Sequence, residues 1–287
     1  MNPAPWFLPL REPPDGAPRL YVFPHAGAGS TAAQPLADLL TPRLDVRGLN
    51  LPGRQSRLDE PPVTALEPLV SHLARELAVA AEPYAVFGYC GGALLAFLTV
   101  RRVHELGGRL PVRLFVGSFA APDIALLPRR LPTLPSDLFW DEVLDLGGVS
   151  PEVAEHAELR PVFEGALRAD YRLVGGYVHR PAPPPPVPIT VLHGGRDATL
   201  SRGELAGWRR QSTAATRVRT LDASHWLVED APEELAELLA DELDGTGSKV
   251  PAGEHGERRR PPPDPTPRQG SGHERPGRDR TAGMGGA

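Results

Sequence analysis

Lysine is almost absent from this sequence, and cysteine occurs only once. The sole lysine, Lys249, lies near the C-terminus, so residues 1–245 offer no amine for a Schiff base and none for a phosphate-binding loop. The sole cysteine, Cys90, has no second thiol with which to form an internal disulfide. Schiff-base catalysis and lysine-dependent phosphate binding are therefore excluded for residues 1–245, and so is an internal disulfide.

Long apolar runs are missing as well. Residues 1–14 do not combine a basic segment with an apolar run, as a secretory signal would require. No stretch approaches the roughly 20 apolar residues that span a bilayer. We therefore expect a cytoplasmic protein with no membrane partner.

The charge is unevenly distributed along the chain. Residues 246–287 carry eight Lys or Arg and five Asp or Glu, a net charge of +3, which leaves −8 on residues 1–245 out of the total of −5. This acidic body argues against a nucleic-acid partner. Residues 246–287 are rich in Gly, Pro and Arg and can bury little apolar surface, so we predict a disordered tail whose charges are solvated.

Short apolar runs alternate with helical patterns through most of residues 20–243. The alternation predicts a mostly parallel sheet with helices on both faces, in one domain over residues 1–245. Between about 124 and 180 the alternation breaks, and we interpret this segment as a helical lid. The expected strands are 20–23, 44–51, 84–87, 112–116, 189–192 and 218–221. The expected helices are 34–40, 65–80, 93–106, 136–146, 151–174, 204–211 and 232–243, of which 136–146 and 151–174 belong to the lid.

The sequence Gly88-Tyr89-Cys90-Gly91-Gly92 joins a buried strand to an apolar helix. A Gly-x-Cys-x-Gly pattern in this context predicts a nucleophile elbow, in which a tight turn lifts the Cys90 side chain above the sheet. The free N–H groups and positive dipole end of the following helix would face the reacting centre and lower the pKa of the thiol. The alternative is an inert thiol buried in the core.

The order Cys90, Asp197, His225 is the nucleophile, acid, histidine order of α/β-hydrolases. Asp197 follows the expected strand 189–192, and His225 follows the expected strand 218–221. Both side chains should therefore reach the sheet edge at which Cys90 is presented. The sequence predicts an α/β-hydrolase fold in which His225 is the base and Asp197 orients it.

Other residues remain as alternatives at this stage. His193 also lies at a strand end and could replace His225, and Asp222 is the second candidate for the acid. Asp123 and Asp170 lie in or near the lid and are expected to be solvated.

An acyl transfer also requires donors for the oxyanion. The candidates are the backbone N–H groups of Gly91, directly after the nucleophile, and of Ala26 in the small-residue loop 25–29. The small side chains of this loop let its backbone approach a carbonyl group closely. His25 could line the pocket without taking part in the chemistry, and a merely flexible turn is the alternative for the loop.

With these residues the chain resembles the type II thioesterases, stand-alone α/β-hydrolases that serve polyketide and nonribosomal peptide synthetases. The resemblance covers about residues 20–243. It implies an acyl or aminoacyl substrate on the 4'-phosphopantetheine of a carrier protein, a mobile lid, docking of the acyl or peptidyl carrier protein near that lid, and no cofactor or metal of the enzyme's own. The matching segments are Phe23-Pro24-His25-Ala26-Gly27, Leu51-Pro52-Gly53-Arg54 with Arg57, Glu60-Pro61-Pro62, the elbow, Leu167-Arg168-Ala169-Asp170, Pro188-Ile189-Thr190 and Ser224-His225-Trp226.

The chain departs from the family at the elbow, where Tyr89, Cys90 and Gly91 stand in place of the usual histidine, serine and methionine. A serine ester is committed to water, whereas a cysteine thioester exchanges with another thioester at nearly equal free energy. We expect a thioesterase that forms an acyl intermediate on Cys90. An acyl or aminoacyl transferase is the alternative, and a non-catalytic binding protein with a hydrolase fold is a third interpretation. The acyl group and the oligomeric state are left open.

Overall fold

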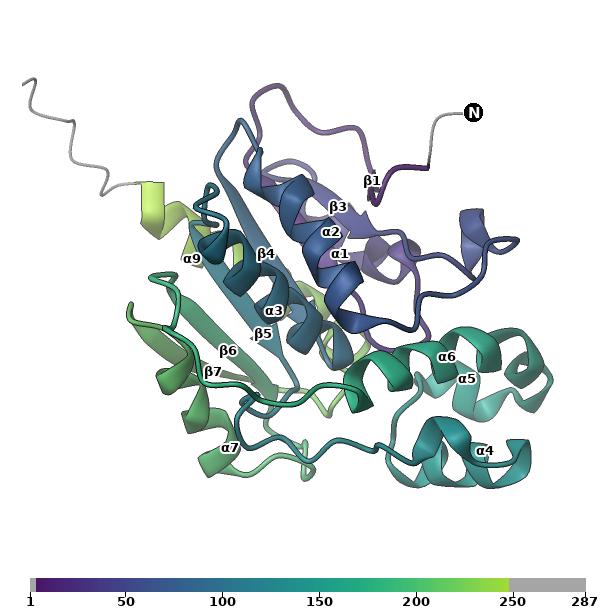
Figure 1. Cartoon of the computed structure of the whole chain (residues 1–287). Helices are drawn as coiled ribbons and strands as arrows, with labels where there is room; N and C mark the ends of the chain where they lie inside the picture. Colours follow the sequence, from purple (N-terminus) through teal and green to yellow (C-terminus); the bar gives the residue numbers. More distant parts are fainter. Residues whose placement is uncertain (1–3, 248–287) are drawn as a thin grey trace, which may run out of the picture. The chain divides into compact units, whose positions relative to one another are not determined.

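The computed structural model describes residues 4–247, which are built on a seven-stranded sheet (Figure 1). The strand order is β1-β3-β2-β4-β5-β6-β7. Among the described residues, β1 alone runs antiparallel to its neighbour, and every other pair is parallel. The strands are β1 Phe7–Pro9, β2 Arg19–Phe23, β3 Asp45–Leu49, β4 Tyr84–Tyr89, β5 Arg113–Gly117, β6 Ile189–Gly194 and β7 Thr216–Leu221.

The six strands expected from the sequence are all present, and β1 is the one that was missed. It has three residues between Pro5 and the loop after Pro9, too short for an apolar pattern to identify it. β1 occupies the sheet edge, where Phe7 pairs with Leu49 of β3. Proline is tolerated at such an edge because one side of the strand makes no ladder hydrogen bonds.

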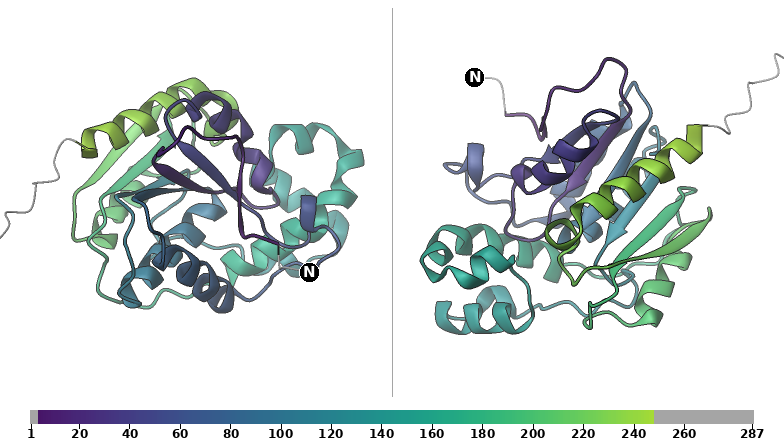
Figure 2. Two further views of the ribbon diagram at one scale, coloured as in Figure 1. Left: turned by 90° about the horizontal axis from the view of Figure 1, so that it is seen from above. Right: turned by 180° about the vertical axis from the view of Figure 1, so that it is seen from behind.

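Helices cover both faces of the sheet, as predicted. Figure 2 shows α9 crossing the face opposite to that of α2 and α3. The helices are α1 Gln34–Leu40, α2 Leu66–Ala78, α3 Gly91–Glu105, α4 Ser136–Asp145, α5 Pro151–Glu155, α6 Arg160–Gly175, α7 Arg202–Ala206, α8 Leu227–Asp230 and α9 Pro232–Gly247. The 3₁₀ segments are η1 Ser30–Ala33, η2 Gln55–Arg57, η3 Leu131–Thr133, η4 Ala157–Leu159 and η5 Gly207–Gln211.

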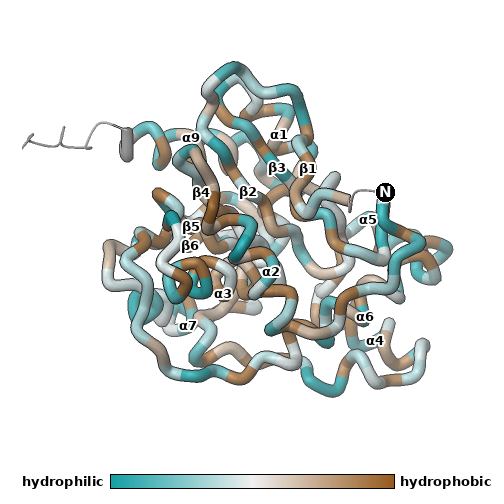
Figure 3. The backbone as a smooth tube through the Cα atoms, turned by 45° about the horizontal axis from the view of Figure 1, so that its top comes forward, coloured by the Kyte–Doolittle hydropathy of each residue, from teal (hydrophilic) through white to brown (hydrophobic). Residues whose placement is uncertain are grey.

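Strand β4 shows why both faces are covered, because all six of its residues are buried. Successive side chains of a strand point to opposite faces. Val86 accordingly packs in the cluster with α2 and α3, and Phe87 packs in the cluster with α1 and α9. Hydrophobic residues also dominate α3, the helix that follows β4, as the brown segments of Figure 3 show.

The lid is a helical insertion between β5 and β6 that contains α4, α5 and α6. The expectation of one helix over 151–174 is wrong, because the chain divides there into α5, η4 and α6. Pro161 lies in the first turn of α6, where its missing N–H costs nothing, but it cannot continue a helix from the preceding residues. Residues 204–211 likewise divide into the last residues of α7 and the segment η5. The lid helices enclose a small apolar cluster of their own that includes Phe139, Val143 and Leu167.

The predicted tail, residues 246–287, lies outside the described residues from 248 onward. Helix α9 continues to Gly247, so the first two residues assigned to the tail are helical. Within residues 4–247, no helix combines the length and the apolar character needed to cross a membrane.

Leu73 on α2 tests the packing of the core. Its side chain is fully buried, whereas Val79, just after the same helix, is 80% exposed. We expect Leu73→Ala to lower the free energy of unfolding by about 2–5 kcal/mol because it leaves a cavity. Val79→Ala should change it by less than about 0.5 kcal/mol. Urea unfolding of both variants measures the difference, and equal losses would show that α2 is not packed as described.

Candidate active site

Cys90 occupies a sharp turn between β4 and α3. Its backbone has φ 52° and ψ −128°, a conformation that few non-glycine residues adopt. The amide of Cys90 donates a hydrogen bond of 2.8 Å to the Gly117 carbonyl oxygen at the end of β5. The turn therefore has the strain and the support of a nucleophile elbow, as its sequence predicts.

The glycines on either side of Cys90 are required by close packing. A Cβ atom at Gly92 would lie 2.3 Å from the carbonyl oxygens of Phe23 and Pro24. A Cβ atom at Gly88 would lie 2.6 Å from the Cβ of Ala96. Any side chain at these two positions would push α3 away from β2 and β4, and Cys90 would move with the helix.

Asp197 and His225 meet at the carboxyl ends of β6 and β7. His225 Nδ1 lies 3.0 Å from Asp197 Oδ2. The other carboxylate oxygen, Oδ1, accepts hydrogen bonds from the Thr199 amide at 2.8 Å and the Thr199 hydroxyl at 2.6 Å. Burial alone would raise the pKa of Asp197, but the hydrogen bonds from His225 and Thr199 lower it to about 2. Asp197 is therefore ionised and orients the imidazole.

The Cys90 thiol lies close enough to the His225 side chain for each group to shift the pKa of the other. Burial raises the pKa of Cys90, but the hydrogen bond and charge of His225, with the backbone amides of Gly91 and Ala26, lower it overall. Burial lowers the pKa of His225, but Asp197 and Cys90 outweigh burial and raise it. Both shifts favour the same charged state, a thiolate beside an imidazolium.

The two expected oxyanion donors lie next to each other. The Ala26 nitrogen is 3.9 Å from the position that a Cβ atom of Gly91 would take, although 64 residues separate Ala26 from Cys90 along the sequence. Both amides lower the pKa of the Cys90 thiol. Ala26 is brought there by the turn after β2, in which the Ala28 amide donates to the His25 carbonyl oxygen at 3.2 Å. Gly27 has φ +80° in this turn, a conformation that favours glycine. Two N–H groups beside one thiol are the arrangement expected for stabilising an oxyanion, and this role of Ala26 and Gly91 stays a prediction.

The alternatives left open by the sequence do not reach this centre. The hydroxyl of Thr220 lies 2.9 Å from His193 Nε2, which keeps His193 at the ends of β6 and β7. Asp222 is mostly exposed and forms an ion pair with Arg196. His225 and Asp197 are the histidine and carboxylate that the structure brings together with Cys90.

Two residues that support His225 were not identified from the sequence. The Tyr89 hydroxyl donates a hydrogen bond to the His225 carbonyl oxygen at 3.0 Å, and the Ser118 hydroxyl donates to the same oxygen at 2.8 Å. Burial raises the pKa of Tyr89 far above its usual value, so this hydroxyl remains a donor. Tyr89 was noted only as a departure from the family pattern, and nothing local to the sequence indicates its partner.

The expectation that Asp123 and Asp170 are solvated is wrong. Asp170 on α6 is buried, and both of its oxygens accept hydrogen bonds from Arg54, at 2.6 and 2.8 Å. Asp123 forms an ion pair of 2.7 Å with Arg210, and its side chain is only 18% exposed. Asp170 belongs to the family motif at residues 167–170, but its partner, Arg54, lies 116 residues earlier in the chain, so the sequence does not reveal the contact.

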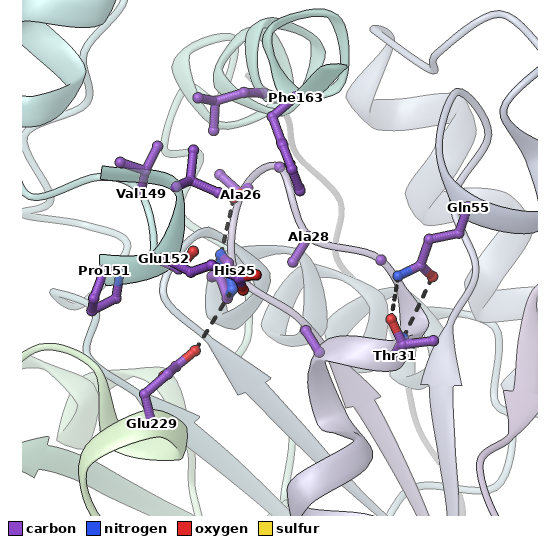
Figure 4. A pocket seen from close by; sticks show the side chains of 16 residues that line it. His25, Ala26, Ala28, Thr31, Gln55, Val149, Pro151, Glu152, Phe163 and Glu229 are labelled. Atoms are coloured by element: carbon purple, nitrogen blue, oxygen red, sulfur yellow. Dashed lines mark hydrogen bonds and ion pairs between the residues drawn. The ribbon is translucent and has the colours of Figure 1, made fainter. Parts of the chain in front are cut away.

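A pocket of about 360 Å³ lies between the 25–29 loop, the lid and α8 (Figure 4). Val149, Val153, Phe163 and Leu167 form its apolar lid side. On the other side, His25 Nε2 faces Glu229 Oε1 at 4.0 Å. Burial lowers the pKa of His25 to about 4, so this ring is neutral at pH 7.

Ala26 lies on the wall of this pocket, and its backbone amide also lowers the pKa of Cys90. The pocket therefore adjoins the reacting centre. In the part of the chain that the structure describes, no group of three or more His, Cys, Asp or Glu side chains is placed to hold a metal ion.

Comparisons with known proteins point to one family. The model of the thioesterase domain family matches residues 18–243. The gramicidin S biosynthesis protein GrsT of Aneurinibacillus migulanus is 28% identical, over 83% of this chain and 93% of its own. Thioesterase PikA5 of Streptomyces venezuelae is 31% identical, over 83% of this chain and 85% of its own. The solved structure of the type II thioesterase BorB from the borrelidin biosynthetic cluster has a TM-score of 0.76 at 30% identity, and covers 83% of this chain and 97% of that one.

The pH dependence of thiol alkylation tests the thiolate–imidazolium pair. The thiolate is the reactive species, and an ordinary thiol has a pKa of about 8.5. Because the pKa of Cys90 is lowered, it should react with iodoacetamide well below that pH. In His225→Ala, burial would no longer be offset by the imidazole, and the midpoint should move above about 8.5. Cys90 is the sole cysteine, so labelling is unambiguous. Identical midpoints in the two proteins would contradict the pair.

Asp197→Asn tests which carboxylate orients His225. We expect turnover of an acyl thioester to fall by about 10²–10⁴-fold, because the amide stabilises neither the imidazolium nor the correct tautomer. The matched control is Asp222→Asn, an exposed carboxylate near the same strand ends, which should turn over like the wild type. Steady-state rates, with circular dichroism to verify folding, provide the measurement. The opposite pattern would transfer the role to Asp222.

Proposed function

The chain belongs to the thioesterase family, as a relative of the type II thioesterases of polyketide and nonribosomal peptide biosynthesis, and from this premise we propose its substrate and mechanism. The substrate is an acyl or aminoacyl group carried as a thioester on the 4'-phosphopantetheine of a carrier protein. The nucleophile is Cys90. One observation carries the proposal: Cys90 occupies the strained turn after β4, and the hydrogen-bonded pair of His225 and Asp197 stands beside it at the ends of β6 and β7.

The first half-reaction loads the enzyme. The Cys90 thiolate attacks the thioester carbonyl carbon, and the carbonyl oxygen becomes an oxyanion that accepts hydrogen bonds from the Ala26 and Gly91 amides. The tetrahedral intermediate collapses with cleavage of the bond to the pantetheine sulfur. The His225 imidazolium donates its proton to this leaving thiolate, and Asp197 remains ionised throughout. The products are a free carrier thiol and an acyl group on Cys90.

The second half-reaction removes the acyl group. His225, now neutral, accepts a proton from the incoming nucleophile as it attacks the acyl carbon. The Cys90 sulfur leaves as the thiolate, and the imidazolium beside it favours its departure. With water as the nucleophile the reaction is hydrolysis, and with another thiol, amine or alcohol it is acyl transfer.

Acyl transfer is the second candidate function, and the cysteine itself favours it. The intermediate on Cys90 is a thioester, so passing the group to another carrier thiol exchanges two bonds of nearly equal free energy. The family relationship favours hydrolysis, and we place hydrolysis first. A non-catalytic role is disfavoured because His225 hydrogen-bonds to Asp197 and stands beside Cys90, which is the catalytic order.

The partner in this proposal is an acyl or peptidyl carrier protein, which brings the phosphopantetheine arm. The arm is part of the substrate, and the enzyme needs no cofactor of its own. The pocket of about 360 Å³ adjoins Ala26 and has apolar lid side chains, so we assign the acyl group to it.

Intact-protein mass spectrometry tests the intermediate. Mixing the enzyme with an acylated carrier protein should add the acyl mass to the wild type, because the thioester on Cys90 is covalent. Cys90→Ala should gain no mass and release no acyl group. Acylation elsewhere, seen as added mass on Cys90→Ala, would contradict the mechanism.

The same loaded enzyme distinguishes the two functions. An unloaded second carrier protein is added, and free acid and newly acylated carrier are measured over time. Release of acid as fast as in the absence of the second carrier supports the hydrolase. Faster appearance of the acylated second carrier than of free acid would establish the transferase instead.

A further inference from the structure

The turn that carries Ala26 is held by side chains from outside it. The Gly27 amide donates a hydrogen bond of 2.7 Å to Asp170 Oδ2 on α6. The Ala28 carbonyl oxygen accepts a hydrogen bond of 2.8 Å from Arg54 Nη1. The first and third peptide groups after Ala26 are thus fixed by one carboxylate and one guanidinium, which also bind each other.

The pair formed by Arg54 and Asp170 has the geometry of strong, directional binding. Arg54 Nη1 lies 2.6 Å from Asp170 Oδ2, and Nη2 lies 2.8 Å from Oδ1, which is a bidentate contact. The Arg54 side chain is 6% exposed and that of Asp170 is 9% exposed. Apolar side chains of similar size often serve stability as well as a buried ion pair does, so stability is a weak explanation for this one.

Helix α6 supports both halves of the proposed oxyanion hole. A Cβ atom at Gly27 would lie 2.9 Å from Leu167 Cδ1, and one at Gly91 would lie 3.2 Å from Val174 Cγ2. Leu167, Asp170 and Val174 are spaced by three and four residues, so they share one face of the helix. Ala26 itself packs in the apolar cluster of the lid. One face of a lid helix therefore contacts the residues that supply both amides.

We infer that Asp170, with Arg54, is a positioning residue that makes the oxyanion hole dependent on the seating of lid helix α6. The inference rests on the proposed function, because it assigns the Ala26 amide to the oxyanion. An oxyanion donor acts at 2.7–3.1 Å, so a small rotation of the peptide group between His25 and Ala26 would remove it. Asp170 touches neither substrate nor Cys90 in this role, and acts through the Gly27 amide.

Two reagents separate oxyanion stabilisation from thiol reactivity. With a substrate-like aldehyde, the Cys90 sulfur adds to the carbonyl carbon and the oxygen receives the electron pair, so the adduct needs the hole. With iodoacetamide, the sulfur displaces iodide from a methylene carbon, and no carbonyl oxygen gains charge. Both reactions are measured at a pH at which the thiolate is fully formed. The ratio of aldehyde affinity to alkylation rate then reports on stabilisation by the oxyanion hole alone.

The main variant is the paired substitution Arg54→Met/Asp170→Leu. It replaces the buried ion pair with apolar side chains, so the fold should be retained, with a moderate loss in urea because the buried Gly27 N–H and Ala28 carbonyl become unpaired. Gly27 and Ala28 lose their partners, so acylation and aldehyde affinity should fall by about 10²-fold. The plateau rate of alkylation should stay within about threefold, because the thiolate and His225 remain. A folded variant that keeps wild-type aldehyde affinity would overturn the inference.

A second variant and a control complete the experiment. Asp170→Asn retains an oxygen for the Gly27 amide but loses the charge, so we expect a smaller fall in the same ratio. This variant provides the test if the paired variant does not fold. An unchanged ratio in Asp170→Asn would then overturn the inference. The control is Glu164→Gln, which removes the 2.8 Å ion pair with Arg168 on the same helix but does not touch the turn. The ratio for Glu164→Gln should equal that of the wild type. A fall as large as in the Asp170 variants would show a general effect of disturbing α6, which would overturn the inference.

The wild-type protein keeps this test distinct from that of the proposed function. If the wild type binds no aldehyde and forms no acyl-enzyme, the proposed function itself fails. If it does both, and the variants match it in aldehyde affinity, only the role of Asp170 fails.

Discussion

The contact between the Cys90 sulfur and the His225 imidazole is the interaction on which the rest of the site depends. Each partner opposes the effect of burial on the other: alone, the thiol would stay protonated and the imidazole would stay neutral. Asp197 adds a fixed negative charge behind the imidazole, and two backbone amides add partial positive charge in front of the sulfur. The pair is therefore stable as ions only while four separate segments of the chain meet at one point.

The sheet brings these segments together. Parallel strands end at the same edge, so the loops after β2, β4, β6 and β7 deliver Ala26, Cys90, Asp197 and His225 to one place. Close packing fixes the rest, because Gly92 lets α3 approach the carbonyls after β2 without a side chain between them. The strain at Cys90 is sustained by this packing and by the hydrogen bond to Gly117.

Features that depend on local pattern could be predicted from the sequence, and features that depend on distant partners could not. The turn at Cys90 and the placement of Ala26, Asp197 and His225 at strand ends follow from residue type and from the end of a strand, whereas their catalytic roles stay predictions. Asp170 was misjudged because its environment is set by Arg54, and Tyr89 was not understood because its acceptor is the carbonyl of His225. The edge strand β1 is too short to produce a pattern, and the break before α6 depends on Pro161, inside a continuous helical periodicity.

A nucleophile that is already ionised changes where selectivity can reside. A serine must be deprotonated during attack, so its reactivity is limited until a substrate is present. In the proposed mechanism the Cys90 thiolate carries its charge in advance, and any accessible electrophile could consume it. Discrimination must then act on the carbonyl group, through the donors that stabilise its oxygen. In this molecule the turn that contains Ala26 is bound by a carboxylate of the lid, so under the proposed function the chemistry of the acyl group would be tied to the element that lines the pocket.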